Sequence, residues 1–393
     1  MKVQTDQQKI EELLTRGVEE VIHYDSLKKK LESGEQLRVK LGIDPTSPNI
    51  HMGRSIPLLK LRDFQELGHK VVFIIGDFTG IIGDTSDKDA ERPMLTQEAI
   101  EENMRTYEAQ VAKILDMSQV EFHKNSEWLG KLTYGEIGVH ADQFSVADFI
   151  SRENIDKRLS QGKRVSLREV LYPLMQGYDS VAVKADVELG GTDQRFNLLA
   201  GRALQEHFGQ KPQDIIMGPI INGTDGRKMS SSWGNTIALT LEPNDMYGKV
   251  MSMADSEIVS YFTYCTRVPL SRVHEIETAL DGGANPRDSK MELARAIVTM
   301  YHSEEAALSA EINFIETFQK GGVPDDVLEI KPNYIDALLQ NGVVASKTEL
   351  RRLLEDGGVR NAETGDKYDV IPEAVTEPVT LKIGKRRFVK LLP

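Results

Sequence analysis

The sequence has 393 residues, of which 40% are hydrophobic and 28% charged, so it is long enough for two or three globular domains. Its formal net charge of -13 excludes a protein that coats nucleic acid by bulk electrostatics, because phosphate binding requires concentrated Lys and Arg. The single cysteine, Cys265, and the absence of a signal-peptide core or a membrane-length apolar run lead us to expect a cytoplasmic protein with no membrane segment.

The first elements along the chain predict an α/β fold. Apolar residues at helical spacing predict a helix over residues 9–31, and alternating apolar residues predict a strand over 37–42. The prolines of residues 44–49 predict a loop. A second helix over 53–67 and a buried strand over 71–75 then complete a β-α-β unit, which normally builds a parallel sheet.

Further elements follow this unit. Their patterns predict helices over 96–115, 172–179 and 196–208 and strands over 181–187 and 215–216. After about residue 240 the pattern is mostly helical, and Pro324 and Pro332 bracket a linker.

The tail from residue 333 predicts two short helices, around 335–339 and 348–354, and short strands that end in Lys385-Arg386-Arg387-Phe388. It contains ten Lys or Arg and nine Asp or Glu, a balance of +1 that leaves -14 for the rest of the chain. The tail is therefore one candidate for local contact with nucleic acid.

The segment from Gly42 to Arg54 is the first candidate site. A loop that leaves the carboxyl end of a strand and enters a helix is where open α/β sheets bind ligands, and the free N–H groups of the helix favour phosphate. His51 can donate to a phosphate oxygen and Gly53 permits close backbone approach, although a histidine that merely caps a helix gives the same pattern. Neither a G-x-G-x-x-G fingerprint nor a G-x-x-x-x-G-K-[ST] loop is present.

The segment from Asp225 to Gly234 is the second candidate. Its glycines and three consecutive serines predict a polar loop, in which Lys228, the hydroxyls and the backbone amides can close over a polyphosphate. A purely solvated loop is the competing interpretation.

Three polar residues on one predicted helix form the third candidate. Tyr172, Gln176 and Asp179 are spaced i, i+4 and i+7, so a hydroxyl, an amide and a carboxylate share one helix face. Apolar residues occupy the other faces, which argues against a solvated stripe. Asp84 and the pair Asp193-Gln194 supply further polar groups at expected strand ends, where caps and turns are the alternative interpretation.

Together these motifs resemble the bacterial tyrosyl-tRNA synthetases. The matching segments, in chain order, are Gly42-Ile43-Asp44-Pro45-Thr46, His51-Met52-Gly53, Tyr172-Pro173-Leu174-Met175-Gln176-Gly177-Tyr178-Asp179, Gly191-Thr192-Asp193-Gln194 and Lys228-Met229-Ser230. The tail, with Ser346 to Leu354 and Gly357 to Asn361, is similar to the S4-type RNA-binding domain that ends those enzymes. The resemblance thus covers the whole chain.

The resemblance implies three domains and a homodimer. We expect a Rossmann-like parallel-sheet catalytic domain over 1–235 with an inserted segment at about 120–185, a helical anticodon-side domain over 236–328, and an S4-type domain over 333–393. It also implies ligation of L-tyrosine to tRNA(Tyr) through a tyrosyl-adenylate, with ATP as substrate, Mg²⁺ accompanying the ATP, no dedicated protein metal site, and dimer contacts through the insert.

Residue roles follow from the same matching positions. Catalytic roles are implied for His51, Gly53, Arg54, Lys228 and Ser231. ATP contacts are implied for Gly42, Asp44, Thr46, His51, Gly53, Asp193, Lys228, Met229, Ser230, Ser231 and Ser232. Tyrosine contacts are implied for Asp84, Tyr172, Gln176, Asp179 and Gln194, with Asp179 reading the hydroxyl, and tRNA contacts for Lys347, Arg351, Arg352 and Arg360.

Three positions depart from the family pattern. Arg54 replaces the second histidine of the first signature, Ser231 replaces a lysine of the second, and Lys40 stands where relatives often present a tyrosine. A guanidinium is long enough to reach an ATP phosphate but cannot imitate a neutral imidazole. Two alternatives therefore stay open: a paralogue that makes an aminoacyl-adenylate for a side pathway, and a catalytically weak RNA-binding protein.

Overall fold

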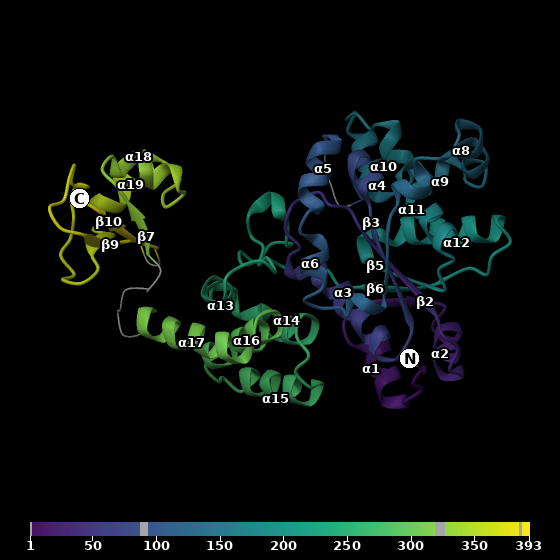
Figure 1. Ribbon diagram of the computed structural model, residues 1–393, viewed down its shortest axis with the longest axis horizontal. Coiled ribbons are helices and arrows are strands. Elements are labelled where there is room, and N and C mark those ends of the chain that lie inside the picture. Colours follow the sequence, from purple (N-terminus) through teal and green to yellow (C-terminus); the bar gives the residue numbers. More distant parts are fainter. Residues whose placement is uncertain (1, 87–92, 319–326, 385–386) are drawn as a thin grey trace. The chain divides into compact units, whose positions relative to one another are not determined.

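The chain forms two compact units in the computed structural model, which describes residues 2–86, 93–318, 327–384 and 387–393 (Figure 1). Unit 1 comprises Met1–Glu242 and Lys249–Tyr301, and unit 2 comprises Pro243–Gly248 and His302–Pro393. None of the helices in the described ranges combines the length and the apolar character that crossing a bilayer requires.

A six-stranded sheet forms the centre of unit 1. Its strands are β1 (Glu20–Ile22), β2 (Arg38–Ile43), β3 (Lys70–Ile75), β4 (Val120–Lys124), β5 (Val187–Gly191) and β6 (Asp214–Gly218), in the order β1-β6-β5-β2-β3-β4. All pairs are parallel except that of β1 with β6. The predicted α/β class and the predicted unit of β2, α3 (Met52–Glu66) and β3 are confirmed.

The strand order has a switch point between β2 and β5. From β2 the chain adds β3 and then β4 on one side, and later places β5 and then β6 on the other. Successive connections therefore leave the carboxyl ends of β2 and β5 in opposite directions. Such a point opens a crevice at that edge of the sheet, which is where doubly wound folds bind ligands.

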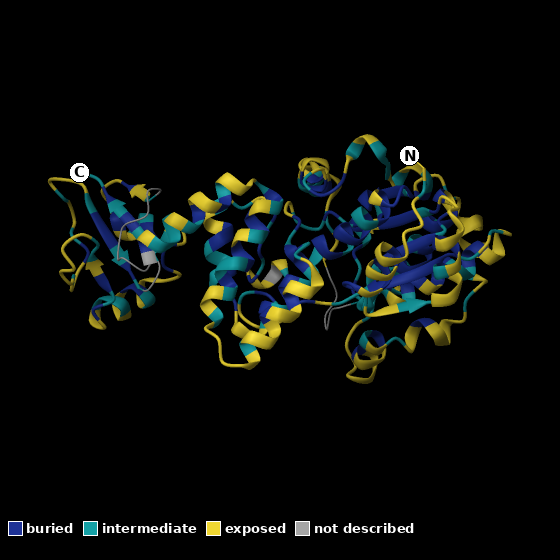
Figure 2. Cartoon of the chain, turned by 90° about the horizontal axis from the view of Figure 1, so that it is seen from below, coloured by how far each residue is buried: buried dark blue, intermediate teal, exposed yellow. Residues whose placement is uncertain are grey.

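Helices surround this sheet, whose four central strands β2, β3, β5 and β6 are mostly buried and are drawn largely in dark blue (Figure 2). α3 packs against β2, β3 and β5, whereas α11 packs against β2 and α12 against β5. Of these two, α11 spans Leu167–Val183 and α12 spans Arg195–His207. The remaining helices of unit 1 are α1 (Gln7–Thr15), α2 (Tyr24–Ser33), α4 (Asp77–Ile82), α5 (Gln97–Met104), α6 (Tyr107–Val111), α7 (Ser126–Leu129), α8 (Tyr134–Ala141), α9 (Val146–Ile150), α10 (Glu153–Ser160), α14 (Ile258–Cys265), α15 (Leu270–Asp281) and α16 (Pro286–Tyr301).

Three predicted elements are wrong in detail. The helix predicted over 96–115 is divided into α5 and α6, which ends at Val111. The other two predictions fail where strands pair. The helix predicted over 9–31 is interrupted, because Gly17 and His23 adopt positive φ angles of 63° and 64° and β1 between them pairs with β6. The strand predicted over 181–187 begins as the last turn of α11, which ends where Lys184 takes a left-handed conformation, and β5 starts only at its last residue. In both places tertiary pairing overrides the local apolar pattern.

Unit 2 contains a small sheet with its own hydrophobic core. The strands β7 (Leu328–Ile330), β8 (Val359–Asn361), β9 (Val379–Ile383) and β10 (Arg387–Leu391) follow the order β7-β10-β9-β8, beside α18 (Tyr334–Gln340) and α19 (Lys347–Glu355). Leu338, Val344, Leu381 and Leu391 are fully buried between them. α17 (Glu304–Phe318) also belongs to this unit, and the residues of α13 (Pro243–Ser252) are divided between the two units.

The division into domains at 1–235, 236–328 and 333–393 stays a prediction. Pro324 of the expected linker and Lys385 and Arg386 of the expected last strand lie outside the described residues.

A buried ion pair joins α10 to α11 and generates the first prediction. Arg158 Nη1 lies 2.6 Å from Glu169 Oε2, and the two side chains are 1% and 0% exposed. Replacing Arg158→Met leaves the Glu169 carboxylate buried and uncompensated, so we expect the free energy of unfolding to fall by about 3 kcal/mol. Urea denaturation followed by tryptophan fluorescence measures this, because both tryptophans lie in unit 1.

The matched control is Arg62→Met, which breaks an exposed pair with Glu66 on α3. We expect a change below about 0.5 kcal/mol there. Equal losses in the two variants would contradict the structural importance of the Arg158 pair.

Candidate active site

A cavity of about 330 Å³ opens at the switch point of the sheet. Its walls come from the carboxyl ends of β2 and β5, the start of α3, the inner face of α11 and the loop after β6. Nearly all the predicted ATP, tyrosine and catalytic residues line it: Gly42, Asp44, Thr46, His51, Gly53, Arg54, Asp84, Tyr172, Gln176, Asp179, Asp193, Gln194, Lys228, Met229, Ser230 and Ser231. Nothing is described of the Ser232 side chain.

The two signature segments are joined by backbone contacts. Met52 N donates to Ile237 O at 2.9 Å. This hydrogen bond fixes the start of α3 against the chain that follows the segment from Asp225 to Gly234, here called the serine-rich loop. Gly53 N donates to Met229 Sδ at 3.2 Å. The first signature therefore supports the second, although they are far apart in the sequence.

The side chain of Asn235 stabilises the serine-rich loop through hydrogen bonds. Its side-chain oxygen accepts from Ser230 N at 2.9 Å, and its amide nitrogen donates to Asp225 Oδ1 at 2.7 Å and to Lys228 O at 3.1 Å. A Cβ on Gly223 would lie 2.3 Å from Asn235 O, so glycine is needed for this close approach. The loop is thus an organised structure, which weakens the interpretation of a merely solvated segment.

Lys228 and Ser231 extend from this loop to other walls of the cavity. Lys228 Nζ lies 3.4 Å from Asp193 Oδ2, beyond the end of β5. Ser231 Oγ lies 3.5 Å from Ser47 Oγ in the loop after β2. An ammonium and hydroxyl groups consequently surround the part of the cavity beside the amino end of α3, as an anion site requires.

His51 is held in a neutral form. Burial, reinforced by the nearby Arg54 charge, lowers the pKa of His51 to about 3. Its Nδ1 is buried and has no hydrogen-bond partner among the described residues. A Cβ on Gly53 would lie 3.2 Å from His51 Cε1, so glycine gives the imidazole its space. The ring is therefore a neutral hydrogen-bonding group beside the cavity.

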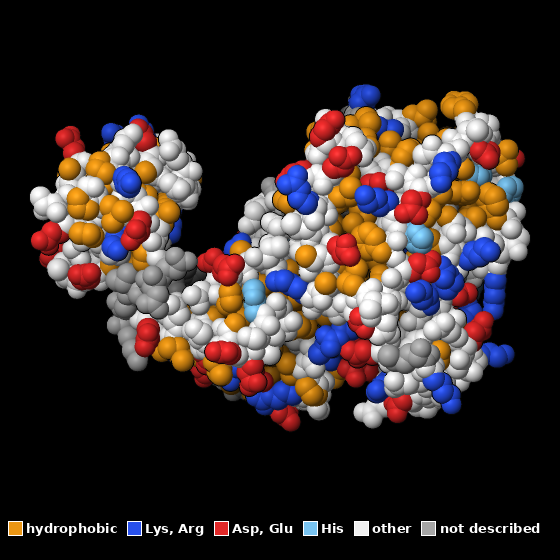
Figure 3. Space-filling view, viewed as in Figure 1, with side chains coloured by type: hydrophobic (Ala, Val, Ile, Leu, Met, Phe, Trp, Pro, Cys, Tyr) orange, Lys and Arg blue, Asp and Glu red, His pale blue; other side chains and the backbone are white. Residues whose placement is uncertain are grey.

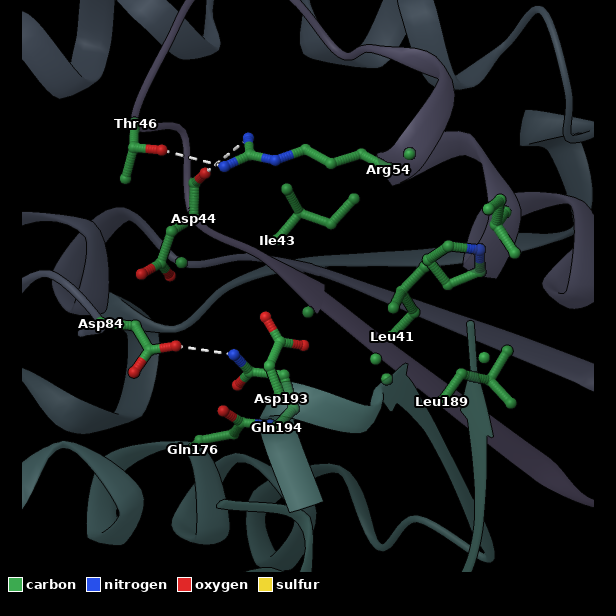
Figure 4. A pocket seen from close by; sticks show the side chains of 18 of the residues that line it. Leu41, Ile43, Asp44, Thr46, Arg54, Asp84, Gln176, Leu189, Asp193 and Gln194 are labelled. Atoms are coloured by element: carbon green, nitrogen blue, oxygen red, sulfur yellow. Dashed lines mark hydrogen bonds between the residues drawn. The ribbon is translucent and has the colours of Figure 1, made fainter. Parts of the chain in front are cut away.

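Arg54 points its guanidinium into the loop that follows β2 (Figure 4). It donates to Asp44 O at 3.2 Å, to Tyr107 Oη at 3.1 Å and to Thr46 Oγ1 at 2.9 Å. Tyr107 Oη in turn donates to Ser47 O at 2.6 Å. Arg54 therefore holds the loop after β2 in place through hydrogen bonds. From the sequence alone, its guanidinium was also expected to be long enough to contact an ATP phosphate.

Asp44 is half-buried directly after β2 and connects three elements. Its carboxylate accepts from Thr79 Oγ1 at 2.7 Å and from Tyr172 Oη at 2.8 Å. Burial raises the pKa of Asp44 to about 6, although these two hydrogen bonds act in the opposite direction. Gly76 leaves room for the carboxylate, because a Cβ there would lie 2.0 Å from Asp44 Oδ1.

Asp179 lies deeper on α11 and is 4% exposed. Trp128 Nε1 donates to Asp179 Oδ1 at 2.7 Å and Asn125 Nδ2 donates to Oδ2 at 3.3 Å. Burial raises the pKa of Asp179 to about 7, against the opposing effects of Lys40 and these two donors. The carboxyl group is an oriented acceptor whose charge is poised near neutral pH.

Asp84 and Gln194 point toward one another across the cavity (Figure 4). Gln194 Nε2 donates to Asp84 Oδ2 at 2.6 Å, and Asn197 Nδ2 donates to Gln194 Oε1 at 2.9 Å. The side chain of Gln194 is therefore oriented by partners at both ends.

No cluster of three or more His, Cys, Asp or Glu suited to a metal ion occurs in the described ranges.

Several cavity groups were absent from the predicted site. Trp128 and Asn125 orient Asp179, and Thr79 orients Asp44. Trp128 and Asn125 follow β4, which was not predicted, and nothing in the local sequence of Thr79 indicates its role. Lys40 was noted only as a departure. A lysine inside an otherwise apolar strand, and likewise Glu188, was the available signal of a buried charge pair.

Comparison with known proteins places this site in a family. The model of the class I tRNA synthetases for tryptophan and tyrosine matches residues 32–319. A tyrosine–tRNA ligase of Carboxydothermus hydrogenoformans is 46% identical, with 97% of both chains covered, and one of Thermotoga maritima is 44% identical, with 96% of both covered. This chain belongs to the tyrosine–tRNA ligase family.

Solved structures share the fold of this ligase family member. The tyrosyl-tRNA synthetase of Archaeoglobus fulgidus, complexed with L-tyrosine, superposes with a TM-score of 0.62 at 24% identity, over 77% of this chain and 99% of that one. A truncated mitochondrial tyrosyl-tRNA synthetase of Aspergillus nidulans gives 0.67 at 19% identity, over 80% and 95% of the two chains. The predicted fold class is confirmed for the class I catalytic part.

The packing of Gly76 against Asp44 generates the second prediction for this tyrosine–tRNA ligase. Gly76→Ala would place a methyl group in the position of the Asp44 carboxylate, so we expect the free energy of unfolding to fall by about 1–3 kcal/mol. The control is Gly138→Ala in α8, where a Cβ meets nothing within 4 Å. That variant should gain about 0.5–1 kcal/mol, because alanine favours a helix interior. Urea titration of both variants measures the difference, and equal signs would contradict the prediction.

Proposed function

We propose that this chain activates L-tyrosine with ATP and transfers the tyrosyl group to tRNA(Tyr). The observation that carries the proposal is a single cavity lined at both ends by suitable groups. A buried, oriented Asp179 lies at one end, and the imidazole of His51 and the ammonium of Lys228, which are suited to binding phosphate, lie at the other. Family membership makes the chain a ligase. Its close relatives along nearly the full chain are tyrosine–tRNA ligases, which disfavours both a side-pathway paralogue and a catalytically weak RNA-binding protein.

The chemistry proceeds in two transfers. A carboxylate oxygen of tyrosine attacks the α-phosphorus of ATP, so the new oxygen–phosphorus bond forms as the bond to pyrophosphate breaks. A terminal ribose hydroxyl of tRNA then attacks the tyrosyl carbonyl carbon, and AMP leaves. Neither transfer needs a nucleophile from the protein, so catalysis consists of positioning and of stabilising charge on the phosphate oxygens.

The tyrosine end of the cavity matches its substrate by hydrogen-bond type. The Asp179 carboxylate accepts from the phenol hydroxyl in addition to its two protein donors, and phenylalanine offers no hydroxyl to make this third hydrogen bond. We assign the substrate ammonium to Asp84, Tyr172 and Gln176, and the reacting carboxylate to the surroundings of Gln194.

The ATP end is built from donors and from close backbone. We assign the nucleotide to Gly42, Asp44, Thr46, His51, Gly53, Asp193 and the loop from Lys228 to Ser232. His51 donates as a neutral imidazole, whose low pKa keeps it uncharged at neutral pH. Lys228 must exchange its Asp193 partner for phosphate oxygens. Mg²⁺ would arrive with ATP and neutralise its phosphate charge, since the protein need supply few ligands for it.

The substitutions at Arg54 and Ser231 change how the ATP end is held. Arg54 already donates to the loop after β2, so we assign it the role of keeping that loop in place rather than a direct contact with ATP. Ser231 supplies a hydroxyl where the family pattern has an ammonium, which leaves Lys228 as the cation of the loop.

We assign tRNA contact to the tail in unit 2. Lys347, Arg351 and Arg352 are exposed on α19, whose Leu350 is buried, and Arg360 is exposed on β8. This distribution leaves the cationic side chains of an amphipathic helix available to phosphates. The sheet and helices of residues 328–391 support the S4-type assignment.

We also propose a homodimer that forms in the cytoplasm. Large apolar side chains are exposed on α8 to α12, and hydrophobic groups are visible over the α8 and α9 region in Figure 3. The most exposed of them are Tyr134, Val139, Val146 and Leu167. Patches of this kind mark protein interfaces, and a second copy of the chain is the partner that the resemblance implies.

The proposal is tested by tyrosine-dependent exchange of pyrophosphate into ATP, followed by charging of tRNA(Tyr). Both reactions are expected. Exchange without charging would favour a side-pathway adenylate enzyme, and no exchange would favour an RNA-binding protein without this activity.

The charge of Asp179 generates the third prediction. Because its pKa is raised to about 7, the carboxyl is ionised above that pH and protonated below it. The ionised form is the better acceptor, so the KM for tyrosine should rise as pH falls through about 7. Asp179→Asn keeps the shape but removes the charge, and should raise this KM about 10- to 100-fold while abolishing its pH dependence. Exchange kinetics at saturating ATP measure both effects, and identical pH profiles in the two proteins would contradict the assignment.

The tail generates the fourth prediction. Arg351→Ala combined with Arg352→Ala should raise the KM for tRNA and reduce its salt dependence, since each lost phosphate contact lowers the salt slope by about 1. Pyrophosphate exchange should stay unchanged. The control is Lys390→Ala, which removes one positive charge that pairs with Glu329 on β7. An equal effect per charge in the control would indicate non-specific attraction instead of a defined contact.

A further inference from the structure

A buried ion pair lies directly behind the tyrosine end of the cavity. Lys40 of β2 and Glu188 of β5 are opposite each other in the parallel register, at the switch point of the sheet. Lys40 Nζ lies 2.9 Å from Glu188 Oε1, and both side chains are 1% exposed. Two opposite charges buried this deeply are costly unless geometry and further hydrogen bonds compensate them.

Every proton of the Lys40 ammonium has an acceptor. Besides Glu188, it donates to Gln176 O at 2.9 Å and to Ser180 Oγ at 2.8 Å, both on α11. Lys40 therefore has no proton left for a substrate hydroxyl. It acts on the cavity through α11 and through its charge, which opposes the effect of burial on the pKa of Asp179.

Both oxygens of the Glu188 carboxylate also accept hydrogen bonds, and they determine the orientation of the Gln176 side-chain amide. Its Oε1 accepts from Gln176 Nε2 at 3.1 Å, and its Oε2 accepts from Ser180 Oγ at 3.0 Å and from Gln213 Nε2. An ionised carboxylate only accepts, so it forces the nitrogen of the Gln176 amide toward itself. The carbonyl oxygen of Gln176 is then turned away from Glu188.

α12 packs closely against the partners of the pair. A Cβ on Gly201 of α12 would lie 2.6 Å from Gln213 Nε2, 3.0 Å from Ser180 Oγ and 3.4 Å from Glu188 Oε2. A glycine at position 201 therefore leaves the space that the hydrogen-bonded groups around Glu188 occupy.

We propose that Lys40 and Glu188 are positioning residues for tyrosine binding: Glu188 orients the Gln176 amide so that its carbonyl oxygen meets the substrate ammonium, and Lys40 anchors the turn of α11 that carries Gln176 and Asp179. The inference rests on the proposed function, because it deepens the assignment of the tyrosine site.

The test compares Glu188→Gln with a change in a second buried pair, which joins strand β6 of the same sheet to helix α2. A glutamine at position 188 offers either a donor or an acceptor, so it no longer selects one orientation of Gln176. We expect the KM for tyrosine in pyrophosphate exchange to rise about tenfold or more, while the KM for ATP stays within about twofold. The double variant Lys40→Met with Glu188→Gln removes both charges and should show the same selective rise, even if the single variant folds poorly.

The control is Asp214→Asn, which breaks the buried pair of Asp214 with Lys30, 2.8 Å apart and outside the cavity. It should lower the melting temperature and leave the KM for tyrosine unchanged. The inference is overturned if the Glu188 and Lys40 variants lose only melting temperature, as the control does, or if both KM values rise together. Failure of the unaltered protein to exchange pyrophosphate would overturn the proposed function itself, which separates the two results.

Discussion

The parallel pairing of β2 with β5 is the constraint on which the site depends. Connections leave these two neighbouring strands in opposite directions, so their carboxyl ends separate and open the cavity. The same pairing sets Lys40 opposite Glu188 and so places two compensating charges at the wall of the cavity, which Lys40 lines. Topology and electrostatics are therefore linked, because the strand pair that creates the space also holds the helix face that lines it.

Burial shifts the pKa values at the two ends of the cavity in opposite directions. At the tyrosine end, burial raises the pKa of Asp179, and fixed donors from Trp128 and Asn125 keep its oxygens oriented. At the nucleotide end, burial lowers the pKa of His51 and keeps the imidazole neutral. In the proposed reaction, one low-dielectric environment thus gives an acceptor for the substrate hydroxyl and an uncharged donor for phosphate, without a metal ligand set in the described ranges.

The sequence allowed the β-α-β unit and most of the cavity lining to be predicted, because the motifs follow strand ends and strand ends meet at one edge. Asp44 after β2 and Asp193 after β5 are examples. The role of Trp128 could not be predicted, since it depends on β4 pairing with β3. The interruption at Gly17 likewise arises from the long-range pairing of β1 with β6. Local pattern indicates the elements, whereas register and strand order determine which side chains meet.

Arg54 shows how a departure from a family pattern can be absorbed by its neighbours. Its guanidinium is engaged with Asp44 O, Thr46 and Tyr107, so a change at one signature position is accommodated by the shape of the adjacent loop. The permanent charge also helps to keep His51 neutral.

At the proposed nucleotide end, the Asp193 carboxylate and a phosphate of ATP would compete for the same Lys228 ammonium. An arriving phosphate does not meet a bare cation; it must displace a carboxylate already in place, so the binding free energy is the difference between two ion pairs. Partial cancellation of this kind makes the affinity less sensitive to ionic strength than the charge of ATP alone would suggest. The same contact ties the loop of Lys228 to the residues that follow β5, so the carboxylate that competes for the ammonium also helps to position it.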